Sequence, residues 1–245
     1  MPDISYTIHG PPTARAPLLL THGFGASQAM WAPNLDALGA DRRILTWDLP
    51  GHGASGCTGE LTHERCVEEM VGLLDILSAS RAVVGGMSLG GFLSLLFCAR
   101  HPERVAALVL VDTGPGFRDD AAREAWNLWV RALADDLDAR GLAALSGGPE
   151  SAVAQHVAGA AGLATSARAI LTQRDGEVFQ SLGRIAVPAL IVVGAEDDRF
   201  LAAADAMARR IPVADKVLIE DAGHAANMDR PAEFNRSVLE FLRDM

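Results

Sequence analysis

Cysteine is scarce in this chain of 245 residues, and the shortage excludes one class of fold. The three cysteines, Cys57, Cys66 and Cys98, form no CxxC pair and are an odd number. A disulfide scaffold is therefore not expected, and a reduced, cytoplasmic setting is. The first residues also lack the basic start and apolar run of a signal peptide, which agrees with a cytoplasmic location.

Positive charge is also in short supply. Lys216 is the only lysine, and 21 Lys and Arg residues stand against 31 Asp and Glu, a formal net charge of −10. Such a chain repels phosphate backbones and anionic lipid, so we expect neither nucleic-acid nor membrane binding. Residues 82–99 carry no charge, which is close to the length of a membrane span. Their glycines and serines instead favour a strand, a sharp turn and a buried helix.

Signals for cofactors and metals are missing as well. Residues 51–56 spell GxGxxG, the pattern of dinucleotide-binding loops, but residues 57–60 continue as a loop and open no helix. A pyrophosphate would therefore find no helix N-terminus there. The His and Asp residues show neither HExxH nor another metal-ligand spacing. We expect no cofactor and no metal.

What the sequence does contain is an alternation of short apolar runs and longer helical patterns. This alternation predicts an α/β fold with a mostly parallel central sheet flanked by helices. The expected strands are Ile4–Ile8, Pro17–Thr21, Ile44–Asp48, Ala82–Gly86, Ala106–Asp112, Ala189–Gly194 and Lys216–Glu220. The expected helices are Met30–Leu38, Thr62–Ser78, Gly90–Arg100, Leu201–Ile211 and Pro231–Leu242.

The alternation stops between Gly114 and Arg184, where no convincing strand occurs. Apolar residues recur there at helical spacing, with charged residues between them. We predict a core of residues 1–113 and 184–245 with a small helical cap, or lid, of residues 114–183. The same spacing also allows ordinary extra core helices.

The strongest local motif is Gly86-Met87-Ser88-Leu89-Gly90, between an apolar strand and an apolar helix. This is the context of a nucleophile elbow, a tight turn that presents a serine in strained backbone geometry. The positions two before and two after the serine come close together in such a turn, and glycine at both avoids a side-chain collision. Ser88 is therefore the predicted nucleophile.

A serine nucleophile needs a base, and His224 is the best placed histidine. It lies in a loop after the last expected strand, where a residue of an open α/β sheet would face the elbow. His63 and His101 are interpreted as surface residues at helix ends.

The acid that orients the base is predicted to follow another strand. Asp197 and Asp198 belong to the segment 194–198, which follows the apolar run 189–193, and Asp197 is preferred. Asp112, at the end of the preceding strand, competes for the same role. One hydrogen-bonding carboxylate is sufficient to hold the imidazole and stabilise its cationic form.

The oxyanion of a tetrahedral intermediate needs two donors. The backbone N–H of Leu89, directly after the nucleophile, is one candidate. The N–H of Phe24 is the other, because the loop His22-Gly23-Phe24-Gly25 follows an early strand and its glycines let the backbone approach a substrate.

Together these motifs resemble the α/β-hydrolase superfamily, in its serine-nucleophile branch. The matching segments are 22–25, 48–53, the Ser88 elbow, 101–105, the Asp197 loop and 222–224. The resemblance implies an α/β-hydrolase fold with a cap between Asp112 and Arg184. It also implies a cofactor-free Ser-His-Asp enzyme that acts on an ester, lactone or thioester carbonyl. Haloalkane dehalogenases and epoxide hydrolases use an aspartate nucleophile, so Ser88 disfavours them.

The C-terminal part is similar to the branch with enol-lactone hydrolases, carbon–carbon bond hydrolases and the menaquinone-pathway carboxylate synthase, a lyase. Residues 194–200 and 114–118 both resemble that synthase. Its elbow, however, has a tyrosine before the serine and an arginine after the glycines, where this chain has Met87 and Phe92. These departures favour a more apolar acyl group.

We therefore expect hydrolysis of a carboxylic ester or lactone of a small to medium, mainly apolar acyl substrate. Gly23, Met87, Trp126 and Phe200 are the candidate substrate-binding residues. Two alternatives stay open: a carbon–carbon bond hydrolase or lyase that uses the triad for proton transfer, and a non-catalytic receptor with the same fold. A small-molecule substrate is the one partner indicated, and assembly as a homodimer stays open.

Overall fold

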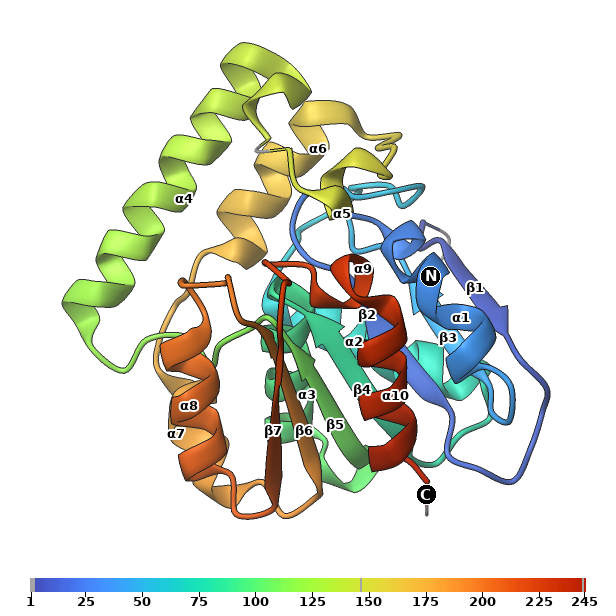
Figure 1. Ribbon diagram of the computed structural model, residues 1–245. Coiled ribbons are helices and arrows are strands. Elements are labelled where there is room, and N and C mark those ends of the chain that lie inside the picture. Colours follow the sequence, from blue (N-terminus) through green and yellow to red (C-terminus); the bar gives the residue numbers. More distant parts are fainter. Residues whose placement is uncertain (1–2, 146, 244) are drawn as a thin grey trace.

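The computed structural model describes residues 3–145, 147–243 and 245 (Figure 1). In these residues seven strands form one sheet in the order β1-β3-β2-β4-β5-β6-β7. Only β1 runs antiparallel to its neighbour within this sheet. The strands are β1 (Tyr6–His9), β2 (Leu18–Thr21), β3 (Ile44–Trp47), β4 (Ala82–Met87), β5 (Val105–Val111), β6 (Ala189–Gly194) and β7 (Ala214–Ile219). The predicted α/β fold with a mostly parallel sheet is confirmed.

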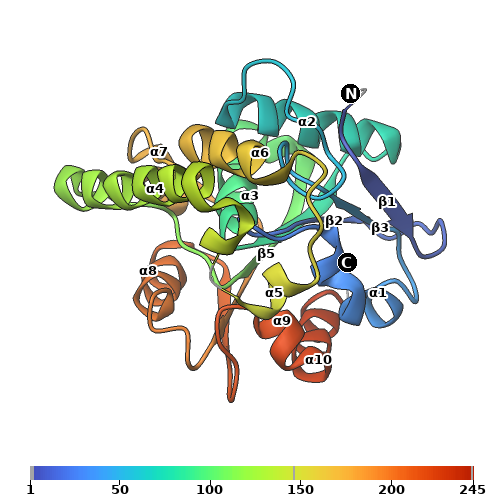
Figure 2. The same ribbon diagram turned by 90° about the horizontal axis from the view of Figure 1, so that it is seen from above.

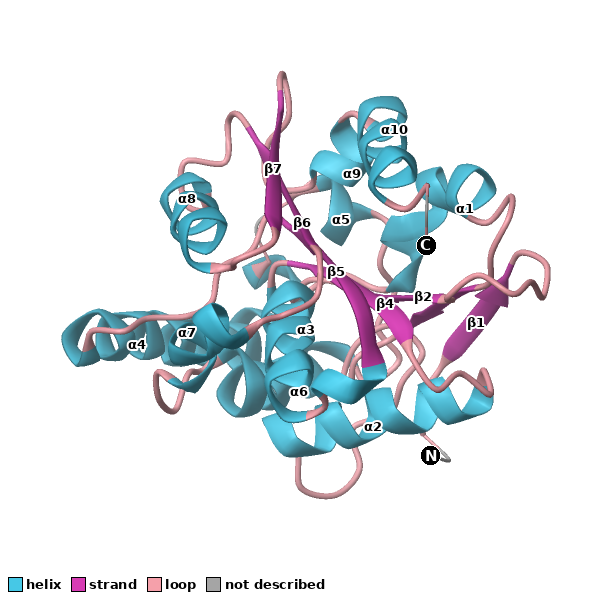
Figure 3. Ribbon diagram, turned by 90° about the horizontal axis from the view of Figure 1, so that it is seen from below, coloured by secondary structure: helices cyan, strands magenta, loops and turns pink. Residues whose placement is uncertain are grey.

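Helices cover both faces of the sheet. The α-helices of the described residues are α1 (Ala32–Leu38), α2 (His63–Ile76), α3 (Leu89–Arg100), α4 (Asp120–Arg140), α5 (Pro149–Ala152), α6 (Gly159–Ser166), α7 (Glu177–Ser181), α8 (Leu201–Arg210), α9 (Ala226–Asp229) and α10 (Pro231–Phe241). In Figure 3, α1, α9 and α10 lie on one side of the sheet and α2 and α3 on the other. Each expected strand and helix overlaps an observed one, with ends displaced by a few residues.

Alternating side chains of the strands build two separate cores. Leu18 and Leu20 of β2 pack with residues of α1 and α10, whereas Leu19 packs with residues of α2 and α3. This alternation follows from the two-residue period of a strand. Since both faces are covered, the central strands are apolar at nearly every position, as expected of a parallel sheet.

The uncharged stretch 82–99 forms β4 and most of α3. Helix α3 is buried along almost its whole circumference, which explains why it carries so few polar residues. No helix in the described part of the chain combines the length and the apolar character that crossing a membrane requires.

Between β5 and β6 the described residues form α4, α5, α6 and α7 and no strand. Figures 1 and 2 show α4, α5 and α6 above the sheet, over the ends of its strands, whereas α7 packs against α3. His156, which precedes α6, links this segment to two loops of the sheet. Its Nδ1 accepts a hydrogen bond from the Gly53 amide at 3.0 Å, and its Nε2 lies 3.2 Å from the Gly25 carbonyl.

The interpretation of His63 as a surface residue is wrong. His63 begins α2 with a buried side chain, and its Nε2 donates to the carbonyl of Ile170 at 2.8 Å. Burial lowers the pKa of His63 below its ordinary value, so this contact is made by the neutral ring. The residue therefore connects α2 to the helical segment that follows α6.

The strand order places a natural binding site between β2 and β4. The chain leaves β2 toward β3 on one side and resumes at β4 on the other, so the loops after β2 and β4 diverge. In open α/β sheets, ligands bind at such a point, outside the carboxyl ends of the strands. The loop after β2 contains Phe24, and the turn after β4 contains Ser88.

Candidate active site

Ser88 lies in a strained turn between β4 and α3. Its φ and ψ of 52° and −116° fall in a region that few residues other than glycine adopt. A Cβ on Gly86 would lie 2.4 Å from the backbone of Gly90, and a Cβ on Gly90 would lie 2.3 Å from the carbonyl oxygen of Thr21. The two glycines of the motif are therefore required by close approach of the backbone.

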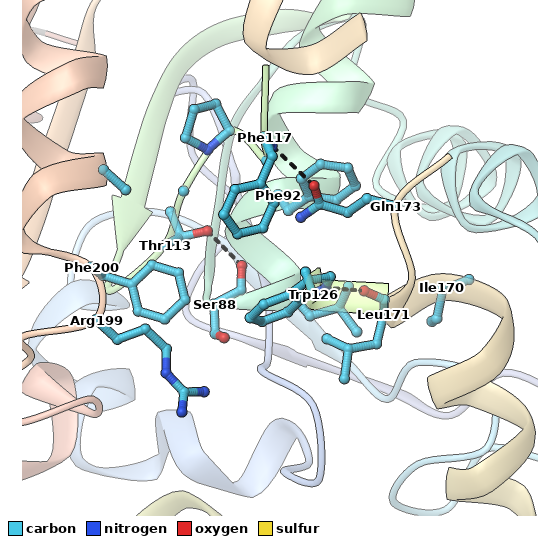
Figure 4. Close-up of a pocket in the computed structure, with 15 residues that line it drawn as sticks. Ser88, Phe92, Thr113, Phe117, Trp126, Ile170, Leu171, Gln173, Arg199 and Phe200 are labelled. Atoms are coloured by element: carbon cyan, nitrogen blue, oxygen red, sulfur yellow. Dashed lines mark hydrogen bonds between the residues drawn. The ribbon is translucent and has the colours of Figure 1, made fainter. Parts of the chain in front are cut away.

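The turn is held by two hydrogen bonds to the neighbouring strand and its loop. The Ser88 amide donates to the Val111 carbonyl at 2.9 Å, and the Thr113 hydroxyl donates to the Ser88 carbonyl at 2.6 Å. These bonds fix the backbone of Ser88 and leave its side chain at the wall of two cavities. Figure 4 shows the bond from Thr113 and the Ser88 side chain.

His224 and Asp197 meet at the same edge of the sheet. Asp197 follows β6 and His224 follows β7, and the His224 Nδ1–H donates to Asp197 Oδ2 at 2.8 Å. The Phe200 ring stacks on the imidazole, with centroids 5.0 Å apart and an angle of 17° between the planes. The contacts with Asp197 and Phe200 fix both the tautomer and the orientation of the imidazole, so Nε2 is the nitrogen available to accept a proton.

The charges around His224 favour its cationic form. Burial alone lowers the pKa of His224, but the hydrogen bond and charge of Asp197, together with the charges of Asp112 and Glu150, outweigh it. The net pKa lies above the ordinary value of 6.5. An imidazole with a raised pKa is a stronger base once it is neutral, which suits proton removal from a hydroxyl.

Asp112, the competitor for the role of acid, has a different set of partners. It is fully buried with a φ of 44°, and its two carboxylate oxygens accept hydrogen bonds from the amides of Gly194 at 2.8 Å and Ala226 at 2.9 Å. Gly194 precedes the Asp197 loop, and Ala226 follows His224. Asp112 thus joins the loop of Asp197 to the loop of His224. Burial raises the pKa of Asp112 to about 7 although both amides favour the ionised form.

Asp112→Asn should lower the free energy of unfolding by about 1–3 kcal/mol, because the asparagine NH₂ would face a buried backbone N–H and leave it unpaired. Urea unfolding followed by circular dichroism measures this loss. Asp221→Asn is the matched control, since Asp221 also has a positive φ but is exposed. Equal stability of the two variants would contradict the role of Asp112.

Two adjoining cavities surround Ser88. The first, called the apolar cavity, is lined by Ser88, Leu89, Phe92, Thr113, Gly114, Pro115, Gly116, Phe117, Trp126, Ile170, Leu171, Gln173, Arg199, Phe200 and Ala203. The second, called the triad cavity, contains Ser88 and His224 together with Phe24, Trp126, Trp129, Ala132, Leu133, Asp136, Ala144, Leu145, Glu150, Ser151, Leu171, Arg199 and Phe200. Ser88 and His224 are therefore accessible from one space.

The sequence-predicted binding residues divide into two groups. Trp126 and Phe200 line both cavities, and Phe24 lines the triad cavity. Gly23 and Met87 line neither. Met87 is buried in the core on the α1 and α10 side of the sheet, and a Cβ on Gly23 would lie 2.6 Å from its sulfur. The structure thus places Met87 in the core behind the loop of Gly23 and Phe24, and it does not line the cavities.

The predicted oxyanion donors are free to bind. Leu89 is the first residue of α3, so its amide has no partner within the helix. Among the described residues, neither this amide nor that of Phe24 donates a hydrogen bond. Phe24 lies in the loop after β2, and Leu89 follows the turn after β4. The arrangement offers two N–H groups, one of them at a helix N-terminus that favours negative charge.

Behind Phe24, a buried histidine fixes the loop. His22 Nδ1–H donates to the Gly23 carbonyl at 2.7 Å, and His22 Nε2 accepts from the Leu49 amide at 2.9 Å. The bond from Leu49 requires the neutral ring, because a protonated Nε2 cannot accept. Burial lowers the pKa of His22 to about 4, although the charge of Asp48 acts in the opposite direction.

We expect stability to fall in mild acid because of His22. The unfolded chain takes up a proton near pH 6.5 and the folded chain only near pH 4, so the stabilisation is complete above pH 6.5 and is lost as the pH falls toward 4. The loss attributable to His22 is about 3 kcal/mol. Urea unfolding at pH 7 and pH 4.5 measures it. His22→Gln, which takes up no proton, should lose less stability over this interval; an equal loss would refute the assignment.

The comparisons with known proteins agree with this geometry. The model of the alpha/beta hydrolase family matches residues 18–237. This chain belongs to that family, and it is an alpha/beta-fold hydrolase. The resemblance predicted from the motifs is confirmed.

The names of similar proteins in the family refer to different activities. The chain is 27% identical to the Bacillus subtilis "Putative 2-succinyl-6-hydroxy-2,4-cyclohexadiene-1-carboxylate synthase", with 94% of this chain and 92% of the relative covered. It is 30% identical to the "Putative carbamate hydrolase RutD" of Pseudomonas savastanoi pv. phaseolicola, with 97% and 98% covered. The crystal structure of the enol-lactonase from Burkholderia xenovorans LB400 superposes with a TM-score of 0.79 at 27% identity, covering 98% of this chain and 96% of that one.

Proposed function

We propose that the protein is a cofactor-free serine hydrolase that cleaves a carboxylic ester or lactone through an acyl-enzyme on Ser88. One observation carries the proposal: Ser88, in a strained turn, shares a cavity with His224, whose Nδ1–H is held by Asp197. A strained serine, an oriented imidazole and a buried carboxylate are the three groups that nucleophilic acyl transfer requires.

The steps follow from the positions of these groups. His224 Nε2 removes the proton of the Ser88 hydroxyl as Oγ attacks the carbonyl carbon, and the amides of Phe24 and Leu89 bind the oxyanion. The imidazolium, stabilised by Asp197, then protonates the leaving oxygen as its bond to carbon breaks. Water, deprotonated by His224, attacks the acyl-enzyme and releases the acid and the free Ser88 hydroxyl.

The apolar cavity supports a small to medium, mainly apolar acyl group. Its empty space is about 640 Å³, a figure that includes the space open to solvent at its mouth. Aromatic rings of Phe92, Phe117, Trp126 and Phe200 form much of its wall beside Ser88. Such a wall stabilises alkyl or aryl groups by removing their surface from water.

Fluorophosphonate labelling followed by mass spectrometry, together with turnover of a panel of p-nitrophenyl and lactone substrates, tests the proposal. We expect labelling at Ser88 and hydrolysis of p-nitrophenyl butyrate. Absence of labelling and of turnover would refute the serine mechanism.

The similarity to the Bacillus subtilis synthase supports a second candidate, a carbon–carbon bond hydrolase or lyase that uses the same triad for proton transfer. Labelling of Ser88 without turnover of any ester or lactone in the panel would favour this alternative. A ligand-binding receptor that has kept the fold would bind a ligand tightly and turn over nothing.

A further inference from the structure

Gln173 is held in one orientation in the wall of the apolar cavity. Its Oε1 accepts a hydrogen bond from the Phe117 amide at 3.0 Å, which Figure 4 shows as a dashed line. Because a backbone N–H requires an acceptor, this bond also determines which end of the side-chain amide is the nitrogen. Nε2 therefore faces away from the Phe117 amide.

The backbone of Gln173 is fixed as firmly as its side chain. Asn127 of α4 donates from Nδ2 to the Gln173 carbonyl and accepts from the Gln173 amide through Oδ1, both at 2.8 Å. The neighbouring Trp126 donates to the Leu171 carbonyl at 2.8 Å. Three hydrogen bonds thus join residues 171–173 to α4.

Gly116, in the loop between β5 and α4, lies directly beside the side chain of Gln173. Gly116 has a φ of 77°, and a Cβ at this position would lie 2.6 Å from Gln173 Oε1. Any larger residue would displace the amide or strain the backbone. The loop of Gly116 and Phe117 and helix α4 together hold the side-chain amide of Gln173 in one position.

The other polar side chains of the cavity already have a role. Thr113 donates to the Ser88 carbonyl, Trp126 donates to Leu171, and the exposed Arg199 lies over the Trp129 ring at 5.1 Å. Within the described residues, Gln173 Nε2 has no hydrogen-bond partner. Among the half-buried side chains that line this cavity, it is the donor besides Ser88 that remains for a ligand; the Leu89 amide lies beside Ser88, and the guanidinium of Arg199 is exposed.

We propose that Gln173 Nε2 forms a polar subsite that binds an acceptor oxygen of the acyl group, remote from the carbonyl that Ser88 attacks. The proposal deepens, and rests on, the serine hydrolase function. The substrate class is accordingly an ester or lactone whose mainly apolar acyl chain carries a second oxygen, such as a ketone. A donor in an apolar cavity loses water when substrate binds, so a chain without that oxygen leaves it unpaired.

The test compares two series of p-nitrophenyl esters that differ only in one carbonyl. The first contains 4-oxopentanoate, 5-oxohexanoate and 6-oxoheptanoate, and the second contains the alkanoates of equal length. The ratio of kcat/KM for the oxo ester to kcat/KM for the alkyl ester is corrected by the ratio of their rates in hydroxide alone. We expect a corrected ratio of about 10 in the wild-type protein at one chain length, the size of one neutral hydrogen bond.

Gln173→Glu tests the donor role of Nε2 separately from the structural bond between Oε1 and the Phe117 amide. The glutamate keeps an acceptor for the Phe117 amide but offers no donor, so the corrected ratio should fall about 10-fold. Gln180→Glu is the matched control, because Gln180 is exposed on α7 and lines neither cavity. Its ratio should equal that of the wild type. Gly116→Ala, which displaces the amide of Gln173, should lower the ratio as Gln173→Glu does.

The outcomes distinguish failure of the proposed Gln173 subsite from failure of the proposed serine hydrolase function. Hydrolysis of both series with a corrected ratio near 1 at every length, or a ratio unchanged in Gln173→Glu, would overturn the subsite and leave the serine hydrolase intact. Failure of the wild-type protein to hydrolyse either series would overturn both. If Gln173→Glu does not fold, the wild-type ratio and the Gly116→Ala ratio decide the question.

Discussion

Ser88→Ala should reduce kcat for p-nitrophenyl butyrate by about 10⁶-fold, the loss seen when a serine nucleophile is removed from an acyl-transfer triad. The physical reason is that the acyl-enzyme cannot form, and the oxyanion donors alone accelerate only the direct attack of water. Initial rates, with circular dichroism to establish folding, measure the effect. The variant should also resist fluorophosphonate labelling.

Ser78→Ala is the matched control for this prediction. Ser78 also has a positive φ, of 54°, but it is exposed just after α2 and lines neither cavity. It should retain wild-type activity. Turnover by Ser88→Ala within a few-fold of the wild-type rate would contradict the proposed acyl-enzyme mechanism.

Asp197→Asn should reduce kcat by about 10⁴-fold while leaving the fold intact. The asparagine NH₂ would donate to His224 Nδ1 and place the imidazole proton on Nε2, where it cannot accept the proton of Ser88. The exposed neighbour Asp198→Asn controls for a general loss of charge and should stay active.

The same substitution should move the pH profile. The charge of Asp197 helps to raise the pKa of His224 above 6.5, and the base must be neutral to act. Wild-type kcat/KM should therefore fall as the pH drops through a value above 6.5, and the residual activity of Asp197→Asn should fall only at lower pH. A profile from pH 4.5 to 9 measures the shift. An acid limb that stays in place would contradict the assignment of His224 as the base.

The sheet and the elbow could be predicted from the sequence because their causes are local. Continuous apolar runs mark strands buried on both faces, and the collision between positions 86 and 90 is a property of the turn itself. The order of strands then brings Asp197 and His224 to one edge, since parallel strands end at the same side. Local pattern and the topology of parallel strands were together sufficient for these residues.

Other features depend on contacts that no local pattern encodes. Asp112 bonds to amides 82 and 114 positions away, and His63 bonds to a carbonyl 107 positions away. Met87 is adjacent to the nucleophile in sequence, yet the alternation of β4 turns its side chain into the core. Gln173 carries no motif at all, and its place in the cavity follows only from the packing of α4 on residues 171–173.

The apolar cavity takes part of its wall from a stretch of chain that contains none of the predicted catalytic residues. Phe117, Trp126, Leu171 and Gln173 belong to the segment between β5 and β6, whereas Ser88, Asp197 and His224 lie on loops at the ends of the strands. Under the proposed function, mutations in the former would change which molecule is recognised without disturbing how its bond is broken. Natural drift or directed evolution of residues 115–175 can therefore diversify substrates on one unchanged reactive centre.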